Sequence, residues 1–466
     1  FPYTKLFRSA IVDVVKCFNH LPRIPMMEVI THLGVHPNLV STWFRALQGM
    51  VRRFSIRGSA GPPIKSSTGC AEGCGLSVVG MFAINCLIDC FMKHRAPEVK
   101  LLSFVDNMEV ISNRAHLTRE GLYQLRRITE LLDIQLDEKK TVVWSNDKKE
   151  RKYLRDSEHQ VAMWTRELGG HVQFSKQMTN SVITNRIKNF KSRWPDIARS
   201  QAPYTQKLKA IKMVAWPNAL HGITSVHLGD EHYEHLRTGA LRGLGEHMWG
   251  ASPAIHLSLV EHPSADPGFH GVLKTVMDFR SMTEADACIP VLTKLAEPND
   301  RKKPTVGPCS VLLQRLHAIN WHWDDDTFWD HNGFAIDLWQ QPIQDIRLRL
   351  TEAWQTQAMH HVAHRASFQG ISQTSPYLTT ANFPQNSSDA SILRKCLNGT
   401  FFTADHQKYR DADESTDCPF CHNADSQFHR HWECPSLEDA RKSMPEHHRQ
   451  LAMQSHPATA WPVGGG

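Results

Sequence analysis

Four short runs of apolar residues stand out in the first third of the chain, at 9–15, 101–105, 108–112 and 141–144. Each is rich in residues that favour strands and bounded by polar or turn-forming ones, which is the pattern of a β-strand. The second and third runs are separated only by Asp106 and Asn107. Because both residue types favour tight turns, and Asn tolerates the left-handed conformation, these strands are expected to form a hairpin with Asp106 at its tip.

Two helices are expected between the strands. The first opens at residues 75–77, and its apolar residues recur every three or four positions: Val79, Phe82, Ala83, Cys86, Leu87, Cys90 and Phe91. The second can be capped by Thr118, and its apolar positions are Leu122, Leu125, Ile128, Leu131 and Leu132. Strands and helices mixed in this way predict the α+β class.

The pattern changes after a run of charged residues at 148–152. Helices rich in Lys and Arg are expected at 180–220, and a mostly helical pattern continues through 230–365. Residues 372–390 are rich in Ser, Thr, Asn and Gln and predict a linker. The chain is therefore divided into 1–160, 161–225, 226–370, 371–400, 401–440 and 441–466.

Composition narrows the class of protein. The chain has 466 residues, 41% of them hydrophobic, which suits two to four domains with buried cores. No run approaches the roughly 18 apolar residues of a membrane span, so no membrane partner is expected. The net charge of +6 suits a polyanionic partner, and the 11 scattered cysteines indicate reduced thiols in an intracellular protein. Because the chain opens on Phe1 rather than Met, we expect a fragment that lacks its upstream part.

Two carboxylates lie at the ends of predicted strands. Asp13 follows an apolar run, as does Asp106, and a glycine-rich loop at 69–75 lies between them in the sequence. A carboxylate at the edge of a buried strand is costly unless it binds a cation or another partner. The combination suggests metal-assisted chemistry on phosphates. Either Asp taken alone is better explained as an ordinary turn or strand-end residue, and only the combination changes that.

The segments around these residues resemble motifs of the reverse transcriptases of non-long-terminal-repeat retrotransposons. The matching segments are 13–23, 69–77, 104–107, 136–141 and 167–170, in the family's order and spacing. The last of them is similar to the start of the family's primer-grip region. The resemblance covers roughly residues 1–220 and implies an RNA-directed DNA polymerase. Its palm, an antiparallel sheet with helices, would be 1–160, and its helical thumb 161–225.

The resemblance also implies the chemistry of the site. Asp13 and Asp106, with Asn107 beside them, would hold two Mg²⁺ ions on the incoming deoxynucleoside triphosphate and the primer 3′-hydroxyl. Lys140 would lie near the leaving pyrophosphate. A solvated charge is the alternative for Lys140 when that residue is taken by itself.

Three further residues would select the substrate. Phe18 would lie under the sugar and exclude a 2′-hydroxyl, although a plain core aromatic explains it as well. Glu72 and Gly73 would lie beside the nascent base pair, where a missing side chain permits close approach.

The chain departs from the family at three places. Asn107 replaces the usual second Asp, and an Asn oxygen coordinates Mg²⁺ more weakly. Ala71 and Glu72 stand where the family often has a larger or basic residue followed by Gln. The chain begins just before the first motif, so the fingers are expected to be absent. These departures favour an alternative, a catalytically degenerate remnant that binds nucleic acid; an RNA-processing factor on a polymerase fold is a third reading.

Basic residues follow one predicted helix in the thumb region. Arg186, Lys188, Lys191 and Arg193 alternate with apolar residues, so they would form a cationic face opposite a packed one. Such a face suits the phosphates of a primer–template duplex. A merely solvated helix face explains these charges equally well.

Four ligand-type residues near the C-terminus have the spacing of a zinc site: Cys418, Cys421, His429 and Cys434. Three Cys and one His suit one tetrahedral, structural Zn²⁺. His422 and His431 are rival ligands, and free thiols placed by chance are the alternative. Arg430 and Trp432 within this unit could contact a phosphate and a base.

The sequence therefore predicts a palm, a thumb, a helical connector of unknown role (226–370), a linker (371–400), a zinc unit (401–440) and a tail (441–466). The expected partners are an RNA template, a DNA primer or target and deoxynucleoside triphosphates. The expected location is intracellular, in the nucleus.

Overall fold

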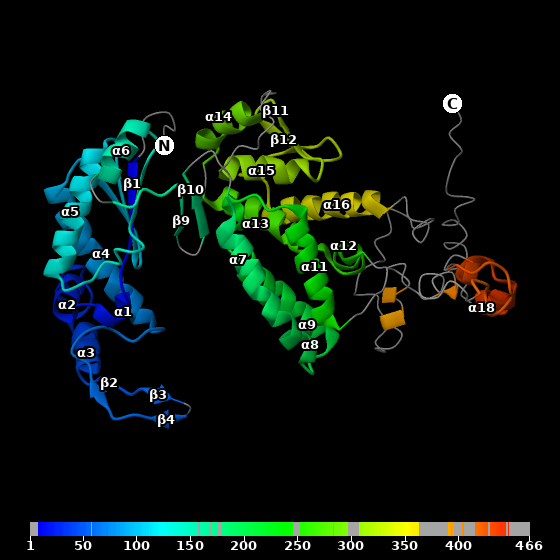
Figure 1. Ribbon diagram of the computed structural model, residues 1–466, viewed down its shortest axis with the longest axis horizontal. Helices are drawn as coiled ribbons and strands as arrows, with labels where there is room; N and C mark the ends of the chain where they lie inside the picture. The colour runs from blue at the N-terminus through cyan, green and yellow to red at the C-terminus, as the bar shows by residue number, and fades with distance from the viewer. Residues whose placement is uncertain are drawn as a thin grey trace. The chain divides into compact units, whose positions relative to one another are not determined.

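The computed structural model describes residues 8–56, 58–156, 159–167, 170–174, 179–245, 252–282, 284–296, 307–362, 390–392, 394–395, 403–404, 415–426, 429–443 and 446. The chain divides into two compact units, Phe1–Thr179 and Asn180–Gly466. Figure 1 labels the elements of both units.

The first unit is built on a four-stranded antiparallel sheet with the order β6-β7-β1-β8. Its strands are β1 (Arg8–Asp13), β6 (Lys100–Phe104), β7 (Asn107–Ser112) and β8 (Val142–Ser145). In the register of β1 and β7, Asp13 lies opposite Asn107. The strands predicted from the four apolar runs are confirmed, and so is the tight hairpin between β6 and β7.

Helices complete the core of this unit. They are α1 (Cys17–His20), α2 (Arg23–His32), α3 (Pro37–Gln48), α4 (Gly75–Arg95), α5 (Ala115–Leu131) and α6 (Lys148–Asp156). The core joins Val12 and Val110 of the sheet to Ile84 of α4 and Leu122 of α5. The buried inner strands thereby hold both carboxylate-bearing segments against a rigid support.

Helix α4 buries part of the predicted face, including Ala83, together with residues that were not predicted. Met81, Ile84 and Ile88 are fully buried, whereas Val79 is 43% and Phe82 60% exposed. The helix is apolar on nearly every side, so a three-four spacing can be traced along more than one face. Packing against the neighbouring elements, rather than periodicity, decides which face is buried.

By length and composition alone, α4 could also cross a membrane. The core helix of a soluble protein passes the same test, and 44% of the apolar window of α4 is buried inside the structure. Asn85 and Asp89 interrupt the apolar run of α4, which is why the sequence predicted no such segment.

Helix α5 begins earlier than predicted, at Ala115, so that Thr118 lies inside it rather than at its cap. The Thr118 hydroxyl instead shares a hydrogen bond with the hydroxyl of Ser112 (2.7 Å). Most of the predicted apolar face of α5 is buried, but Leu131 is exposed.

Two small antiparallel pairs and a hairpin complete the first unit. β2 (Val51–Arg52) pairs with β5 (Ile64–Lys65), and β3 (Ser55–Ile56) pairs with β4 (Ser59–Ala60). The hairpin consists of β9 (Trp164–Glu167) and β10 (Gly170–Gln173). It contains the segment that resembles the primer grip, of which Leu168 and Gly169 lie outside the described residues.

The second unit is mainly helical. Its helices are α7 (Ser181–Phe190), α8 (Trp194–Arg199), α9 (Tyr204–Ala210), α10 (Trp216–Ala219), α11 (Asp230–Leu244), α12 (Pro253–Ile255), α13 (Pro267–Met282), α14 (Ala285–Ala296), α15 (Pro308–His317), α16 (Ile343–Val362) and α18 (Glu438–Lys442). Shorter turns are η1 (Lys191–Arg193), η2 (Ile211–Ala215), η3 (Ile223–Ser225), η4 (His256–Val260), η5 (Pro263–Ala265), η10 (His429–Glu433) and η11 (Pro435–Leu437).

The two largest apolar clusters of the described residues stabilise most of this unit. The first includes Ile183 and Trp216 and continues past position 225 to Ala265, so the residues predicted as thumb share a core with residues predicted as connector. The second runs from Phe269 to Ala353. It includes residues of a three-stranded sheet, β11 (His322–Asp324), β12 (Thr327–Trp329) and β13 (Ala335–Ile336), which the mostly helical expectation for 230–365 missed. Of the predicted linker and tail, 371–400 and 441–466, only 390–392, 394–395, 441–443 and 446 are described.

Candidate functional site

A cavity of about 820 Å³ lies in the first unit beside the end of β1. It is lined by Asp13, Asp106, Asn107, Lys139, Lys140, Val142, Gln160, Ala162, Met163, Trp164, Thr165 and Arg166. The four residues predicted to be catalytic therefore line a single cavity. They come from three segments that are distant in the sequence, and the sheet brings these segments together.

Asp13 and Lys140 form an ion pair at this cavity. The Lys140 Nζ lies 2.6 Å from Asp13 Oδ2 and 3.4 Å from Asp137 Oδ2. The loop that carries Lys140 is fixed to β1, because the backbone N–H of Asp137 donates to the carbonyl of Asp13 (2.8 Å). The hydrogen bond from Lys140 to Asp13 raises the pKa of the Lys140 ammonium. Lys140 is thus a charged partner of the carboxylate rather than a freely solvated lysine.

The turn that carries Asp106 is held in a strained conformation. Val105 has a φ of +56°, a left-handed backbone that is unfavourable for a β-branched residue. Asn85 of α4 is buried, and its Nδ2 donates to the Val105 carbonyl (2.9 Å). The sequence led us to expect the left-handed residue at Asn107, and it gave no role to Asn85. The sequence does contain one signal for this role. Asn85 is a lone amide among the apolar residues of its helix, and a buried amide requires a hydrogen-bond partner.

Both carboxylates act on the same thiol. Burial, then Asp106, then Asp13 raise the pKa of Cys17 to about 12. Cys17 is buried one residue before Phe18, at the start of α1. Asp13 and Asp106 therefore both lie near Cys17.

This donor set fits a hard divalent cation. Asp13 and Asp106 offer carboxylate oxygens at one cavity, and Asn107, whose Nδ2 lies 3.4 Å from Asp106 Oδ1, adds an amide. Mg²⁺ is commonly bound through one or two carboxylates together with substrate phosphates. The site is therefore suited to Mg²⁺, with Lys140 supplying positive charge beside it.

The glycine-rich loop packs closely against the segment that follows β1. At Gly69 the φ is +74°, and a Cβ would lie 2.2 Å from the carbonyl oxygen of Asn19. The Arg23 guanidinium donates to three carbonyls of the loop, those of Ser66, Thr68 and Gly69 (2.8–3.0 Å). The loop is therefore fixed by its backbone, through an arginine that the sequence did not single out.

The predicted substrate-selecting residues lie along this contact. Phe18 is half-buried against the core, while Glu72 and Gly73 are exposed. The Asn19 Nδ2 donates to Glu72 Oε1 (2.6 Å), which joins the first motif-like segment to the second. Phe18, Glu72 and Gly73 do not line the cavity described above.

The four basic residues predicted to contact nucleic acid differ in their surroundings. Lys188, Lys191 and Arg193 are exposed, whereas Ile187 of the same segment is buried. Arg186 is half-buried, and its Nη1 donates to the carbonyl of His221 (2.5 Å). Three of the four charges therefore face solvent, and the fourth also ties α7 to a neighbouring turn.

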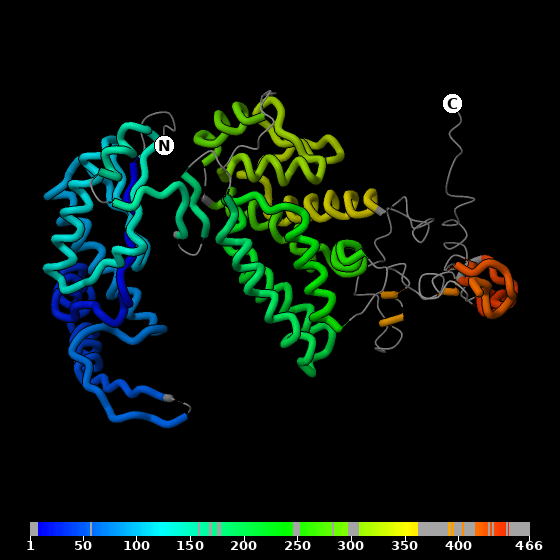
Figure 2. Tube along the Cα trace, viewed as in Figure 1, coloured from blue at the N-terminus to red at the C-terminus, as the bar shows by residue number. Residues whose placement is uncertain are grey.

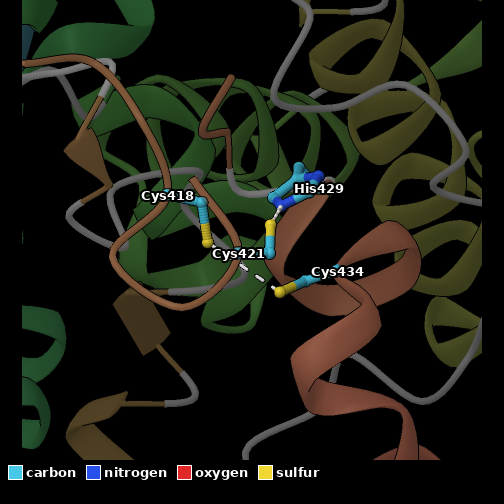
Figure 3. A group of neighbouring side chains, drawn as sticks. All are labelled: Cys418, Cys421, His429 and Cys434. Atoms are coloured by element: carbon cyan, nitrogen blue, oxygen red, sulfur yellow. Dashed lines mark hydrogen bonds between the residues drawn. The ribbon is translucent and has the colours of Figure 1, made fainter. Parts of the chain in front are cut away.

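The four cysteine and histidine residues predicted to bind zinc converge (Figure 3). Their ligand atoms all lie within 4.8 Å of one another. The sulfurs of Cys418 and Cys434 are 3.8 Å apart, and Cys421 Sγ is 3.1 Å from His429 Nε2. Tetrahedral Zn²⁺ with bonds of about 2.3 Å requires a sulfur–sulfur distance of about 3.8 Å. This cluster could therefore hold a metal ion such as zinc.

The surroundings of the cluster favour metal binding. Burial alone would raise the pKa of Cys418, but N–H donors from Phe420 and Cys421, with His429, lower it to about 7. The rival ligand His422 is exposed and outside the group, and the side chains of His431 and Trp432 lie outside the described structure. Arg430 binds Asp425 (2.6 Å), so its predicted phosphate contact competes with an internal ion pair.

No protein-family model matches the chain, and no curated protein matches it. Among solved structures, it is similar to telomerase from Candida albicans in complex with a TWJ fragment of telomeric RNA, with a TM-score of 0.29 and 12% identity over 64% of this chain and 52% of that one. The telomerase from Candida tropicalis in complex with the same kind of fragment gives a TM-score of 0.30 and 9% identity, over 78% of this chain and 48% of that one. The chain thus spans about half the length of each. At TM-scores this low, the likeness assigns neither a family nor a function to the chain.

Proposed function

We propose that the chain is the polymerase part of a retrotransposon reverse transcriptase, which transfers deoxynucleotides to a primer 3′-hydroxyl on an RNA template. The observation that carries this proposal is the single cavity lined by Asp13, Asp106, Asn107 and Lys140. The choice of an RNA template and of a retrotransposon rests on the resemblance of the surrounding sequence segments.

The residues of the cavity have separate tasks in this reaction. The oxygen of the primer 3′-hydroxyl gives up its proton to water and forms a bond to the α-phosphorus of the triphosphate. The bond from that phosphorus to the bridging oxygen breaks, and pyrophosphate leaves with the electron pair. Asp13 and Asp106 would hold Mg²⁺, which when bound offsets the negative charge that develops on the phosphate oxygens. Lys140 lines the same cavity. Once it gives up its ion pair with Asp13, its ammonium would pair with the negative charge of the leaving pyrophosphate.

Two other regions would hold the nucleic acid. Lys188, Lys191 and Arg193 present exposed positive charge that suits the phosphates of a duplex. The Cys and His cluster would hold one structural Zn²⁺, because all four positions are filled by protein and none is open for catalysis.

A catalytically degenerate, nucleic-acid-binding remnant is the second candidate. Two observations favour it: Asn107 offers no charge, and the ammonium of Lys140 already neutralises Asp13. Both lower the affinity of the cavity for divalent cations.

Primer extension separates the two candidates. The full chain is incubated with an RNA template, a DNA primer, deoxynucleoside triphosphates and Mg²⁺. A polymerase extends the primer, Asp106→Ala abolishes extension, and Asn107→Asp increases it through the added carboxylate. Glu130→Gln, an exposed change on α5, is the control and leaves extension unchanged. Absence of extension by the wild type and by Asn107→Asp, with duplex binding intact, would establish the remnant instead.

A further inference from the structure

A narrow ribbon of chain extends from the first unit between α3 and the glycine-rich loop. We call it the basic arm, residues 50–66. Its backbone pairs Val51 with Lys65 in β2 and β5, and Ser55 with Ala60 in β3 and β4. Figure 2 shows it as a blue loop reaching well beyond the helix that precedes it.

The described residues of the basic arm form no core of their own. Phe54 is 71% exposed, Val51 55% and Ile64 47%. A two-stranded ribbon by itself is marginally stable in water, and apolar side chains gathered on an exposed ribbon mark a contact surface. The arm is therefore expected to meet a partner.

The charge of the arm indicates the kind of partner. Arg52, Arg53, Arg57 and Lys65 lie in it, and residues 50–66 contain no Asp or Glu. Arg53 and Lys65 are exposed, and their side chains have no hydrogen-bond or ion-pair partner within the described part of the chain. Their unneutralised charges are complementary to a polyanion.

Arg52 anchors the arm beside the candidate site. Its Nη1 donates to Asn19 Oδ1 (2.6 Å) and its Nη2 to the carbonyl of Cys70 (3.2 Å). Asn19 is in turn bonded to Glu72. A nucleic-acid strand held by the arm would therefore be anchored at the loop of Glu72, which the sequence resemblance puts beside the nascent base pair.

We propose that the basic arm binds single-stranded RNA, with Arg53 and Lys65 on phosphates and Phe54 stacked on an unpaired base. Exposed aromatic side chains stack on bases only where these are not paired, and basic side chains follow the backbone without reading sequence. The choice of RNA rests on the proposed function, in which the template is the single strand that approaches the site.

Binding of a labelled 20-nucleotide oligouridylate tests this inference. Fluorescence anisotropy is measured with the full chain in EDTA and without nucleotide, over a series of salt concentrations. Arg53→Gln with Lys65→Gln should weaken binding about tenfold and reduce the slope of log K against log[salt] by about 1.4, or 0.7 for each phosphate contact. Phe54→Ala should weaken binding at least about fivefold and leave the slope unchanged.

Matched controls lie elsewhere in the first unit. Arg127→Gln with Lys152→Gln removes two exposed cations, and Tyr123→Ala removes an exposed aromatic residue from α5. Neither change should alter binding by more than twofold. Circular dichroism melting shows that each variant is folded; should the double change unfold the chain, Lys65→Gln alone is used, with an expected slope change of about 0.7.

The outcomes separate this inference from the proposed function. Wild-type affinity and salt slope in every arm variant measured would overturn the inference even if primer extension succeeds. Arm-dependent RNA binding without any extension would support it and leave only the polymerase proposal refuted. Tighter arm-dependent binding to a single-stranded DNA of equal length would overturn the choice of RNA. The chain could instead sediment with phosphatidylcholine–phosphatidylserine vesicles, lose this on the arm substitutions and not bind RNA. That result would overturn the inference and assign the arm to a membrane surface.

Discussion

Gly69 lies where two segments of the candidate site touch, and Gly73 in the same loop does not. Both have left-handed backbones, with φ of +74° and +81°, but only Gly69 faces a neighbour, the carbonyl of Asn19. Gly73→Ala should lower the free energy of unfolding by about 1–2 kcal/mol, the usual strain of that conformation. Gly69→Ala adds a clash with backbone and should cost more than about 3 kcal/mol. Urea unfolding measures both, and equal costs would show that the two segments do not pack as described.

His270 on α13 makes the second unit sensitive to acid. Burial, aided by Lys274 and opposed by Asp278, lowers the pKa of His270 from 6.5 to about 4. Below pH 6.5 His270 becomes protonated in the unfolded chain, whereas in the folded chain it stays neutral until about pH 4. The free energy of unfolding therefore falls as the pH falls through this range. Between pH 7.5 and pH 5, this residue should account for a loss of about 2 kcal/mol.

Urea unfolding at the two pH values checks this prediction. His270→Gln cannot take up the proton, so its stability should fall by about 2 kcal/mol less than that of the wild type. His317→Gln, an exposed change on α15, is the control and should behave as the wild type. An equal loss in wild type and His270→Gln would assign the acid sensitivity to other groups.

Single residues were predictable from the sequence where their neighbours in the chain supplied the reason. Asp13 and Asp106 could be singled out because each follows an apolar run. Asn85 and Arg23 could not, because their hydrogen bonds reach Val105 and the loop at 66–69, which only folding brings near. The ion pair between Lys140 and Asp13 was missed for the same reason.

At the scale of elements, the cysteine–histidine unit is the clearest case for a ligand-dependent fold. The ligands come from the turn at Cys418 and Cys421 and from η10 and its end, at His429 and Cys434. Among the residues described at 415–443, the buried apolar side chains are those of Cys418 and Cys434. A zinc ion bound there would therefore stabilise the fold of this unit, since binding and folding are coupled. We expect one zinc per chain, and removal by a chelator should unfold this unit and leave the sheet of the first unit intact.

Metal content of purified variants measures this expectation. Cys421→Ser should lose the zinc, and Cys74→Ser, an exposed thiol of the first unit, should retain it. Full zinc occupancy in Cys421→Ser would eliminate the proposed ligand set.

Elements were predictable where the spacing of apolar residues fitted either a strand or a helix but not both. The four strands of the first sheet are short and bounded, so their type could be predicted, while the strand order depends on pairings that lie far apart in the sequence. Helix α4 could be predicted as a helix, but its buried face could not, because its apolar residues surround the axis. The strands β11, β12 and β13 were missed because two or three residues are too few to show an alternation.

At the scale of the molecule, the two units have separate cores. The first core contains Ile84, and the second unit contains clusters around Leu236 and Leu350. Separate cores predict separate cooperative transitions. Calorimetry should therefore resolve at least two unfolding events. Ile84→Ala should lower the midpoint of one event and Leu236→Ala that of another, each through a loss of about 2–5 kcal/mol. A single transition shifted by either change would mean that the units unfold as one.

The order β6-β7-β1-β8 also determines when each strand can pair during synthesis. Strand β1, which ends at Asp13, is the first strand of its sheet to leave the ribosome, yet its partners are residues 107–112 and 142–145. Until those residues emerge, the apolar residues of β1 have no partner strand and can contact other chains or chaperones. Closing such distant pairings is slow compared with forming helices. Slower translation before position 145 would therefore lengthen the time during which β1 is unpaired. A chaperone that binds the nascent strand would reduce aggregation most during that time.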